Sequence, residues 1–277
     1  MQMSATEPRF SFGQNWLSFI QHLDEERIQA AERSLKEFLG RDDLGGRTFL
    51  DIGCGSGLFS LAARRLGATV HSFDCDADCV ACTRTLKDRF FSNDPAWTVE
   101  KGSILDENYL DRLGRFDIVY AWGVLHHTGA LFKAMEFTGK LVKPGGLLYL
   151  AVYNHQPCWS NFHRTVKRLY VNSPWPGRFL ILSLYVSFQV LKGLVKDIIL
   201  FRNPLARYRV KKRLRGMSVW HDWVDWVGAY PFETARPEEV FDFFRKRGFI
   251  LEKLKTCGGG HGCNEYVFSL PEKAERK

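Results

Sequence analysis

The chain has 277 residues, of which 45% are hydrophobic and 25% are charged, and its formal net charge is +8. These proportions are typical of soluble globular proteins, and the length allows one core plus a lid or subdomain. Seven cysteines, an odd number and mostly isolated, disfavour a disulfide framework, and the N-terminus shows no basic segment followed by an apolar run. We therefore expect a cytoplasmic protein without a secretory signal.

The N-terminal segment, residues 1–44, combines an aromatic cluster with a predicted helix. Phe10, Phe12 and Trp16 form the cluster. A helix is predicted over Trp16–Leu39, before the first apolar strand. Packing of these aromatic rings on the core and coverage of a ligand both remain open.

A glycine-rich turn follows at residues 49–57, which read Phe-Leu-Asp-Ile-Gly-Cys-Gly-Ser-Gly. The pattern predicts an apolar strand, a tight turn and a helix opening at Leu58. Glycines let a ligand approach the backbone closely, and the helix offers unpaired N–H groups. A second strand ends at Asp74, whose carboxylate can accept two hydrogen bonds from a ribose diol. These features predict a nucleoside cofactor.

Asp51 distinguishes between two such cofactors. In a dinucleotide-binding turn this carboxylate would face the pyrophosphate, and two adjacent anions repel each other, so Asp51 argues against NAD. A ligand that carries an ammonium group would instead be attracted to Asp51, directly or through water. S-adenosylmethionine carries that ammonium group, a sulfonium and a ribose.

Three later segments extend this pattern. Residues 101–106 read Lys-Gly-Ser-Ile-Leu-Asp, residues 116–127 read Phe-Asp-Ile-Val-Tyr-Ala-Trp-Gly-Val-Leu-His-His, and residues 141–150 contain Lys-Pro-Gly-Gly. With the glycine turn, they resemble the class I S-adenosylmethionine-dependent methyltransferases in order and spacing. The first looks like the third strand and its adenine loop, the second like the fourth strand, and the last like the turn into the fifth.

The resemblance implies an α/β, Rossmann-like fold with a seven-stranded, mostly parallel sheet in the order 3-2-1-4-5-7-6. Residues 45–153 would form the cofactor-binding core, 154–236 a helical insert after strand five, and 237–277 the last core helix with strands six and seven. In that order the glycine-rich turn at 257–263 lies at the carboxyl end of the sheet, where ligands of open α/β sheets bind.

The resemblance also implies which residues hold S-adenosylmethionine and its product S-adenosylhomocysteine. Asp74 would bind the ribose, Ser103 and Ile104 would flank adenine, and Trp122 would begin the loop after strand four. N-terminal residues of relatives often fold over the cofactor. The complete expected set is Asp51, Gly53, Cys54, Gly55, Gly57, Asp74, Cys75, Ser103, Ile104, Trp122, Asn15 and Trp16. No metal site is predicted.

The insert differs from the rest of the chain in charge. Residues 154–215 hold 13 Lys or Arg and a single acid, Asp197. Within them, Phe179–Phe201 is mostly apolar, and the basic residues continue to Arg215. An apolar helix followed by basic residues is typical of a membrane-surface element, here 178–215; a lid or a solvated basic face gives the same pattern. We therefore expect a cytoplasmic protein that either contacts an anionic membrane or stays free of it. Nucleic acid is disfavoured because no known RNA-binding module accompanies the charge.

Candidates for acceptor chemistry lie after strand four, in the insert and at the last turn. His126 or His127 would act as a general base or position the acceptor, although both could equally be core or helix-start histidines, and His221 and His261 are the next candidates. Carboxylates interleaved with aromatic residues suit a sugar, phenol or amine pocket, although they suit a buried aromatic rim equally well. The substrate candidates are Asp222, Asp225, Trp226, Tyr230, Glu233 and Asn264.

These patterns predict a methyltransferase that acts on a small molecule. The expected acceptor atom is an oxygen of a phenol, a quinone precursor or a sugar. The layout is loosely similar to the quinone-biosynthesis O-methyltransferases. Two alternatives remain: an RNA methyltransferase that uses the basic insert, and a noncatalytic S-adenosylmethionine-binding or membrane-adaptor protein. The sequence leaves the oligomeric state open.

Overall fold

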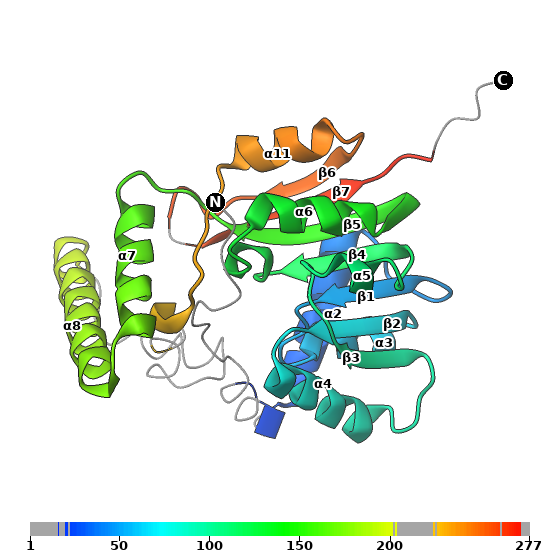
Figure 1. Ribbon diagram of the computed structural model, residues 1–277, viewed down its shortest axis with the longest axis horizontal. Helices are drawn as coiled ribbons and strands as arrows, with labels where there is room; N and C mark the ends of the chain where they lie inside the picture. The colour runs from blue at the N-terminus through cyan, green and yellow to red at the C-terminus, as the bar shows by residue number, and fades with distance from the viewer. Residues whose placement is uncertain are drawn as a thin grey trace. The chain divides into compact units, whose positions relative to one another are not determined.

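The computed structural model describes residues 23–201, 226–260 and 262–272, together with Trp16, Ile20, Gln21, Asn203 and Val224. Figure 1 shows the elements in order. They are α2 (Glu25–Leu39), β1 (Thr48–Ile52), α3 (Leu58–Arg65), β2 (Thr69–Asp74), α4 (Ala77–Phe90), β3 (Trp97–Lys101), α5 (Glu107–Leu110), β4 (Phe116–Trp122), η1 (Leu125–His127), α6 (Leu131–Lys140), β5 (Val142–Tyr153), α7 (Trp159–Asn172), α8 (Trp175–Ile199), α11 (Pro237–Arg245), β6 (Ile250–Lys255) and β7 (Cys263–Ser269).

The sheet has the predicted order, β3-β2-β1-β4-β5-β7-β6. Its first five strands are mutually parallel, whereas β7 runs antiparallel to both β5 and β6. The carboxyl ends of β1, β2 and β4 therefore share one edge, at which the glycine turn, Asp74 and Trp122 all lie. The predicted Rossmann-like fold is confirmed.

Two predicted elements differ from the structure in their bounds. The N-terminal helix was expected over Trp16–Leu39, but α2 begins at Glu25. Asp24 adopts an extended backbone and its carboxylate accepts the N–H of Arg27 at 2.9 Å, so an N-cap starts a new helix there. The third strand ends at Lys101, and residues 102–106 are the loop that follows it.

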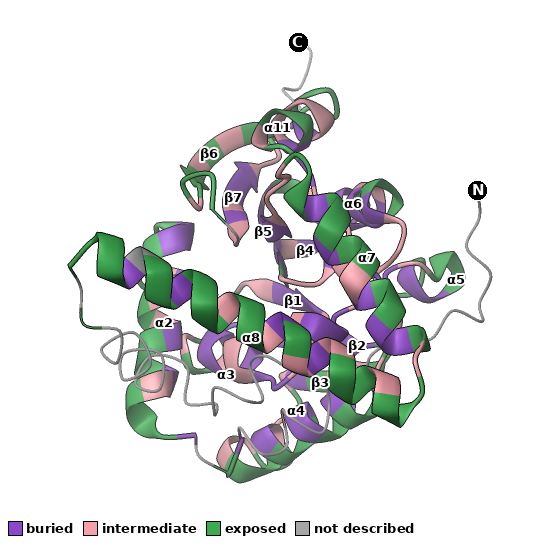
Figure 2. Ribbon diagram, turned by 90° about the vertical axis from the view of Figure 1, so that its left-hand side faces the viewer, coloured by how far each residue is buried: buried purple, intermediate pink, exposed green. Residues whose placement is uncertain are grey.

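Alternating side chains fill both faces of the sheet. Phe49 and Tyr120 point into a buried cluster with α2 and α3, whereas Leu50 and Val119 point into a second cluster with α6 and α11. This period-two alternation is expected of strands covered on both faces. Figure 2 shows the strands buried between their helices.

The described chain divides into two compact units, Cys158–Phe232 and Ser11–Pro157 with Glu233–Lys277. The smaller unit contains α7 and α8, whose facing sides bury Tyr170, Leu182 and Tyr185. Lys167 is completely buried in this unit, and its ammonium nitrogen lies 3.8 Å from the ring centre of Trp226. Burial lowers the pKa of Lys167 well below its usual range.

The larger unit holds together the two chain segments that flank the smaller one. Asn154 pairs with Ala235 in a short parallel bridge. The Ala235 N–H donates to the carbonyl of Tyr153 at 3.0 Å, and the His155 N–H donates to the carbonyl of Ala235 at 3.1 Å. The side chains of His155 and Thr234 are 3.0 Å apart at Nδ1 and Oγ1. We call these contacts the flank bridge.

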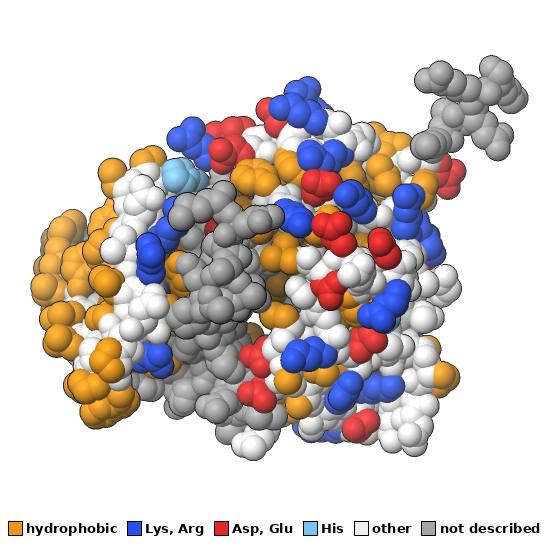
Figure 3. Space-filling view, viewed as in Figure 1, with side chains coloured by type: hydrophobic (Ala, Val, Ile, Leu, Met, Phe, Trp, Pro, Cys, Tyr) orange, Lys and Arg blue, Asp and Glu red, His pale blue; other side chains and the backbone are white. Residues whose placement is uncertain are grey.

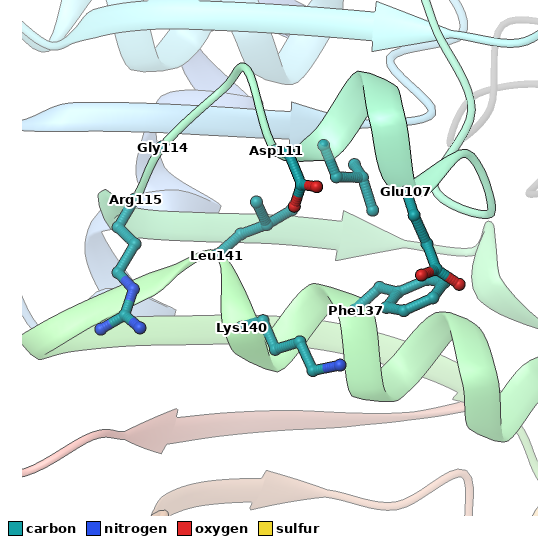
Figure 4. A pocket seen from close by; sticks show the side chains of 8 residues that line it. Glu107, Asp111, Gly114, Arg115, Phe137, Lys140 and Leu141 are labelled. Carbon is teal, nitrogen blue, oxygen red and sulfur yellow. The ribbon is translucent and has the colours of Figure 1, made fainter.

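A pocket of about 320 Å³ lies at the amino ends of β4 and β5, between α5 and the end of α6 (Figure 4). Side chains of both charges line it, including Glu107, Asp111 and Lys140. Because it opens near the start of β4, it lies at the opposite edge of the sheet from the glycine turn.

Candidate active site

The glycine turn has the backbone that its sequence predicts. Gly53, Gly55 and Gly57 all have positive φ, at 70°, 54° and 78°. A Cβ atom on Gly57 would lie 2.9 Å from the side chain of Thr83, and one on Gly53 would lie 2.5 Å from that of Val124. Glycine is therefore required at these positions both for conformation and for space. The turn leads directly into the first turn of α3, whose N–H groups face the same edge.

Asp74 ends β2 beside this turn. Its carboxylate accepts the backbone N–H of Gly55 at 3.1 Å and that of Asp76 at 2.9 Å. Burial raises the pKa of Asp74, and the backbone N–H bonds oppose that rise. Carboxylate oxygens can accept more than one hydrogen bond each, so Asp74 can accept ribose hydroxyls while it holds the turn in shape.

Asp51 lies one strand away and is almost fully buried, with 2% of its surface exposed. The hydroxyl of Ser60, in α3, donates to its Oδ2 atom at 2.5 Å. Burial raises the pKa of Asp51 to about 7, and the hydrogen bond from Ser60 opposes the rise. A ligand cation beside Asp51 would favour the ionised carboxylate, which burial disfavours.

The other expected cofactor residues lie around the same edge. The indole of Trp16 lies against the turn, since a Cβ atom on Gly55 would be 3.5 Å from its Nε1. Ser103 is partly buried and Ile104 is buried in the loop after β3. Cys54 is buried at the turn, and burial raises the pKa of its thiol well above the usual range, which disfavours a thiolate nucleophile. Asn15 lies outside the described residues, and Cys75 follows Asp74 at the surface.

One cluster at this edge was not predicted as a site. Glu265, on β7, accepts hydrogen bonds from the indole of Trp122 at 3.2 Å and from the hydroxyl of Tyr149 at 2.5 Å, both at Oε2. Lys255 lies 3.5 Å from the other oxygen. This cluster fixes the orientation of Trp122, which is 42% exposed at the end of β4. Glu265 follows the glycine-rich turn in the sequence, but its sequence position does not identify its partners.

A family profile described as methyltransferase domain matches residues 23–195, which include the glycine turn, Asp74 and the strand-four loop. The chain belongs to this methyltransferase family. Among curated proteins, this methyltransferase is 32% identical over 111 residues to the ubiquinone biosynthesis O-methyltransferase of Brucella melitensis. The alignment covers 40% of the chain and 43% of that relative, so it spans less than half of the relative's length.

Solved structures share the fold of the methyltransferase. Magnesium protoporphyrin IX methyltransferase from Synechocystis PCC 6803, solved with bound S-adenosylhomocysteine, matches 93% of this chain and 94% of its own, with a TM-score of 0.54 and 13% identity. The 1,6-didemethyltoxoflavin-N1-methyltransferase of Burkholderia thailandensis matches 98% of this chain and 94% of its own, with a TM-score of 0.50 and 13% identity.

The two adjacent histidines of the methyltransferase occupy different environments. His126 is completely buried, and its Nδ1 accepts the backbone N–H of Tyr153 at 3.3 Å, which assigns the ring proton to Nε2. His127 is partly exposed in η1, with its ring centre 4.4 Å from that of His126. Of the two side chains, His127 is the one that is accessible from the surface.

Glu233 supports the same loop. Its backbone N–H donates to the carbonyl of His126 at 2.9 Å, and its carboxylate accepts the N–H of Leu131, the first residue of α6, at 3.0 Å. A carboxylate is favourable at a helix N-terminus. The sequence left Glu233 open between a substrate pocket and an acid that caps backbone groups; in the structure its carboxylate caps α6, and its backbone holds the loop of the histidines.

The remaining acceptor candidates lie elsewhere or outside the described residues. The amide of buried Asn264 accepts the N–H of Cys257 and donates to Asn154, both at 3.0 Å, so it shapes the last turn. Trp226 and Tyr230 pack in the smaller unit. His221, Asp222, Asp225 and His261 are not among the described residues. Within the described part of the chain, no three His, Cys, Asp or Glu side chains form a metal-binding group.

The environments of the two histidines predict opposite phenotypes. His127→Ala is expected to lower kcat by about 10²-fold to 10⁴-fold, the usual contribution of a general base, without changing the affinity for S-adenosylhomocysteine. His126→Ala removes a completely buried ring and its hydrogen bond from the Tyr153 N–H, and is expected to destabilise the fold by about 1–3 kcal/mol. Thermal unfolding and steady-state kinetics on the same two variants distinguish them. Equal losses of activity with unchanged stability would contradict this assignment.

Proposed function

We propose that this protein transfers the methyl group of S-adenosylmethionine to a small-molecule acceptor. The main support for this proposal is a pair of carboxylates at the ends of adjacent strands. Asp74 accepts the N–H of Gly55, and Asp51 is buried under the same turn. Asp74 suits a ribose diol, and Asp51 suits an ammonium group rather than a pyrophosphate. Membership of the methyltransferase family supports the same cofactor.

The test is isothermal titration of the wild-type protein with S-adenosylmethionine, S-adenosylhomocysteine and NADH. Micromolar affinity for the two adenosyl ligands, without binding of NADH, is the expected result. Binding of NADH in their place would overturn the cofactor assignment. Failure to bind any of the three would contradict the proposed activity itself.

For the acceptor, we propose an oxygen of a phenol, quinone precursor or sugar-like metabolite. The similarity to ubiquinone biosynthesis O-methyltransferases supports oxygen as the methylated atom. Methyl transfer is an in-line displacement at the sulfonium, so the acceptor must be held in line with the methyl carbon, and a hydroxyl acceptor must lose its proton. His127 would take that proton. Competition among phenolic, quinol and sugar acceptors in a methyl-transfer assay would identify the class.

We also propose that the smaller unit of the protein docks on the surface of an anionic membrane through α8. The helix has two unlike faces. Leu182, Tyr185 and Asp197 are buried along one face, whereas the opposite face exposes large apolar side chains at helical spacing. These exposed residues are Leu180, Leu184, Phe188, Leu191, Val195 and Ile198. A soluble helix normally shows the reverse arrangement, with polar residues outward.

The exposed face of α8 continues onto α7 at Trp159, whose ring centre lies 6.4 Å from that of Phe188 and 5.8 Å from that of Phe162. Figure 3 shows hydrophobic side chains gathered over α8. Such an area exceeds the scattered apolar residues of ordinary surfaces and is typical of interaction sites. Lys192 lies beside Trp159, with its nitrogen 4.5 Å from the ring centre, and the insert is strongly basic. Apolar side chains flanked by cations favour a lipid surface.

By length and composition, α8 is the one helix in the described part of the chain that could also cross a bilayer: its most apolar window has a mean hydropathy of 1.5 and is 18% buried. We favour the orientation parallel to the membrane because Leu182 and Tyr185 pack against α7. A spanning helix would have to give up that packing.

A further inference from the structure

A row of buried polar side chains runs through the layer between the sheet and α3. The indole N–H of Trp97, on β3, donates to the hydroxyl oxygen of Ser72 on β2 at 2.9 Å. The hydroxyls of Ser72 and Ser60 are 2.7 Å apart. Ser60 in turn donates to Asp51 Oδ2 at 2.5 Å. The first three residues are completely buried, and together the four connect β3, β2, α3 and β1.

The direction of every hydrogen bond in this row is determined by its two ends. An indole nitrogen can only donate, and an ionised carboxylate can only accept. Because the Ser60 proton points to Asp51, its oxygen must accept from Ser72, and the Ser72 oxygen accepts from Trp97. All three donors therefore point toward Asp51, and reversing the bond between the two serines would take the Ser60 proton away from the buried carboxylate.

The surroundings of Asp51 make this direction important. The titratable groups that face it are Asp74 on β2, Cys54 in the turn and Tyr120 on β4. None of these three supplies positive charge. Burial disfavours the carboxylate form, so hydroxyl donors must provide the stabilisation that water would otherwise give.

We infer that Trp97, Ser72 and Ser60 form a directed hydrogen-bond chain that keeps the Asp51 carboxylate ionised to receive the ammonium group of the cofactor. This inference rests on the proposed function. In this arrangement the three residues are positioning residues that act through Asp51. They contribute to recognition of the amino-acid part of the ligand and leave recognition of its adenosine part unchanged.

The pH dependence has a definite sign. Below the pKa of Asp51 the carboxyl is neutral and attracts the ammonium group weakly, so affinity for S-adenosylhomocysteine should rise as pH increases through that pKa. Removing a donor from the chain raises the pKa of Asp51 and moves the midpoint to higher pH. A midpoint that rises from about 7 to about 8 lowers the ionised fraction at pH 7 about fivefold.

The experiment measures binding from pH 5.5 to pH 9 with two ligands. S-adenosylhomocysteine carries the ammonium group, whereas 5′-methylthioadenosine has the same nucleoside without the amino-acid part. The variants are Ser60→Ala, which removes the direct donor, and Trp97→Phe, which removes only the terminal N–H. Phe91→Leu is the matched packing control. The ring centre of Phe91 lies 6.3 Å from that of Trp97, and Phe91 takes no part in the hydrogen-bond chain.

Ser60→Ala and Trp97→Phe are both expected to move the midpoint of the pH profile for S-adenosylhomocysteine binding to higher pH, and Ser60→Ala should move it further. Affinity should recover at high pH. Affinity for 5′-methylthioadenosine should stay within twofold of wild type, and Phe91→Leu should shift neither profile. Equal losses for both ligands at every pH, or an unmoved midpoint, would overturn the inference. If the wild-type protein binds neither ligand, the proposed function itself has failed.

Discussion

Asp74→Ala is expected to reduce the affinity for S-adenosylhomocysteine by about 10²-fold or more. The substitution removes both acceptors for the ribose diol, and each hydrogen bond to a charged group contributes about 1.5–3 kcal/mol. It also removes the acceptor for the Gly55 N–H, so the turn that carries the cofactor loses its fixed shape. Isothermal titration of the variant and the wild-type protein measures the change.

Two variants separate these contributions. Asp74→Asn keeps one oxygen and the shape of the side chain, so it should lie between wild type and Asp74→Ala. Asp76→Ala removes a neighbouring acid that caps α4 by accepting the N–H of Asp78 at 2.9 Å, and it should leave affinity nearly unchanged. An Asp74→Ala variant that binds as tightly as wild type would refute the ribose assignment.

Leu184→Glu combined with Leu191→Glu is expected to abolish co-sedimentation with vesicles of phosphatidylglycerol and phosphatidylcholine. The two leucines are 63% and 60% exposed on the outward face of α8. Each buried leucine side chain contributes about 1.5–3 kcal/mol, so losing both should lower partitioning by about 10²-fold or more. The added carboxylates also repel the anionic surface.

The matched control carries the same change of charge in the larger unit. Ile250→Glu with Leu254→Glu replaces two exposed apolar residues of β6 and should retain most of the sedimentation. Raising the salt concentration should weaken wild-type binding, because charge attraction is screened. Retention after an alkaline carbonate wash would indicate a spanning helix instead. If the wild-type protein remains in the supernatant, the membrane proposal is wrong and α8 is better interpreted as part of a lid.

Local spacing and alternation were sufficient to predict the glycine turn and the strand that ends at Asp74. The glycine turn, Leu58 and Asp74 lie within 25 residues of one another, and the strand order followed from the family resemblance. Positive φ at Gly53, Gly55 and Gly57 is the backbone that a tight strand-to-helix turn requires. The glycines of the sequence are therefore sufficient to explain the backbone of this turn.

Contacts between distant segments could not be predicted in this way. Trp122 and Glu265 are 143 positions apart, and they meet only because β5 and β7 pair in one antiparallel register. A shift of one residue would turn Glu265 to the other face. The partners of Ser60 and Ser72 depend similarly on how α3 packs over β2. A serine in an apolar pattern indicates a small side chain but does not identify its hydrogen-bond partner.

The flank bridge has a consequence for how this protein can vary. Because Asn154 and Ala235 are already paired in the larger unit, the 80 residues between them close a loop whose ends the core itself holds together. The entropy cost of lengthening such a loop grows only with the logarithm of its length. The larger unit is therefore little affected by the length of residues 158–232, which can grow or shrink at small entropic cost, whereas Glu233 still has to orient the loop of the histidines.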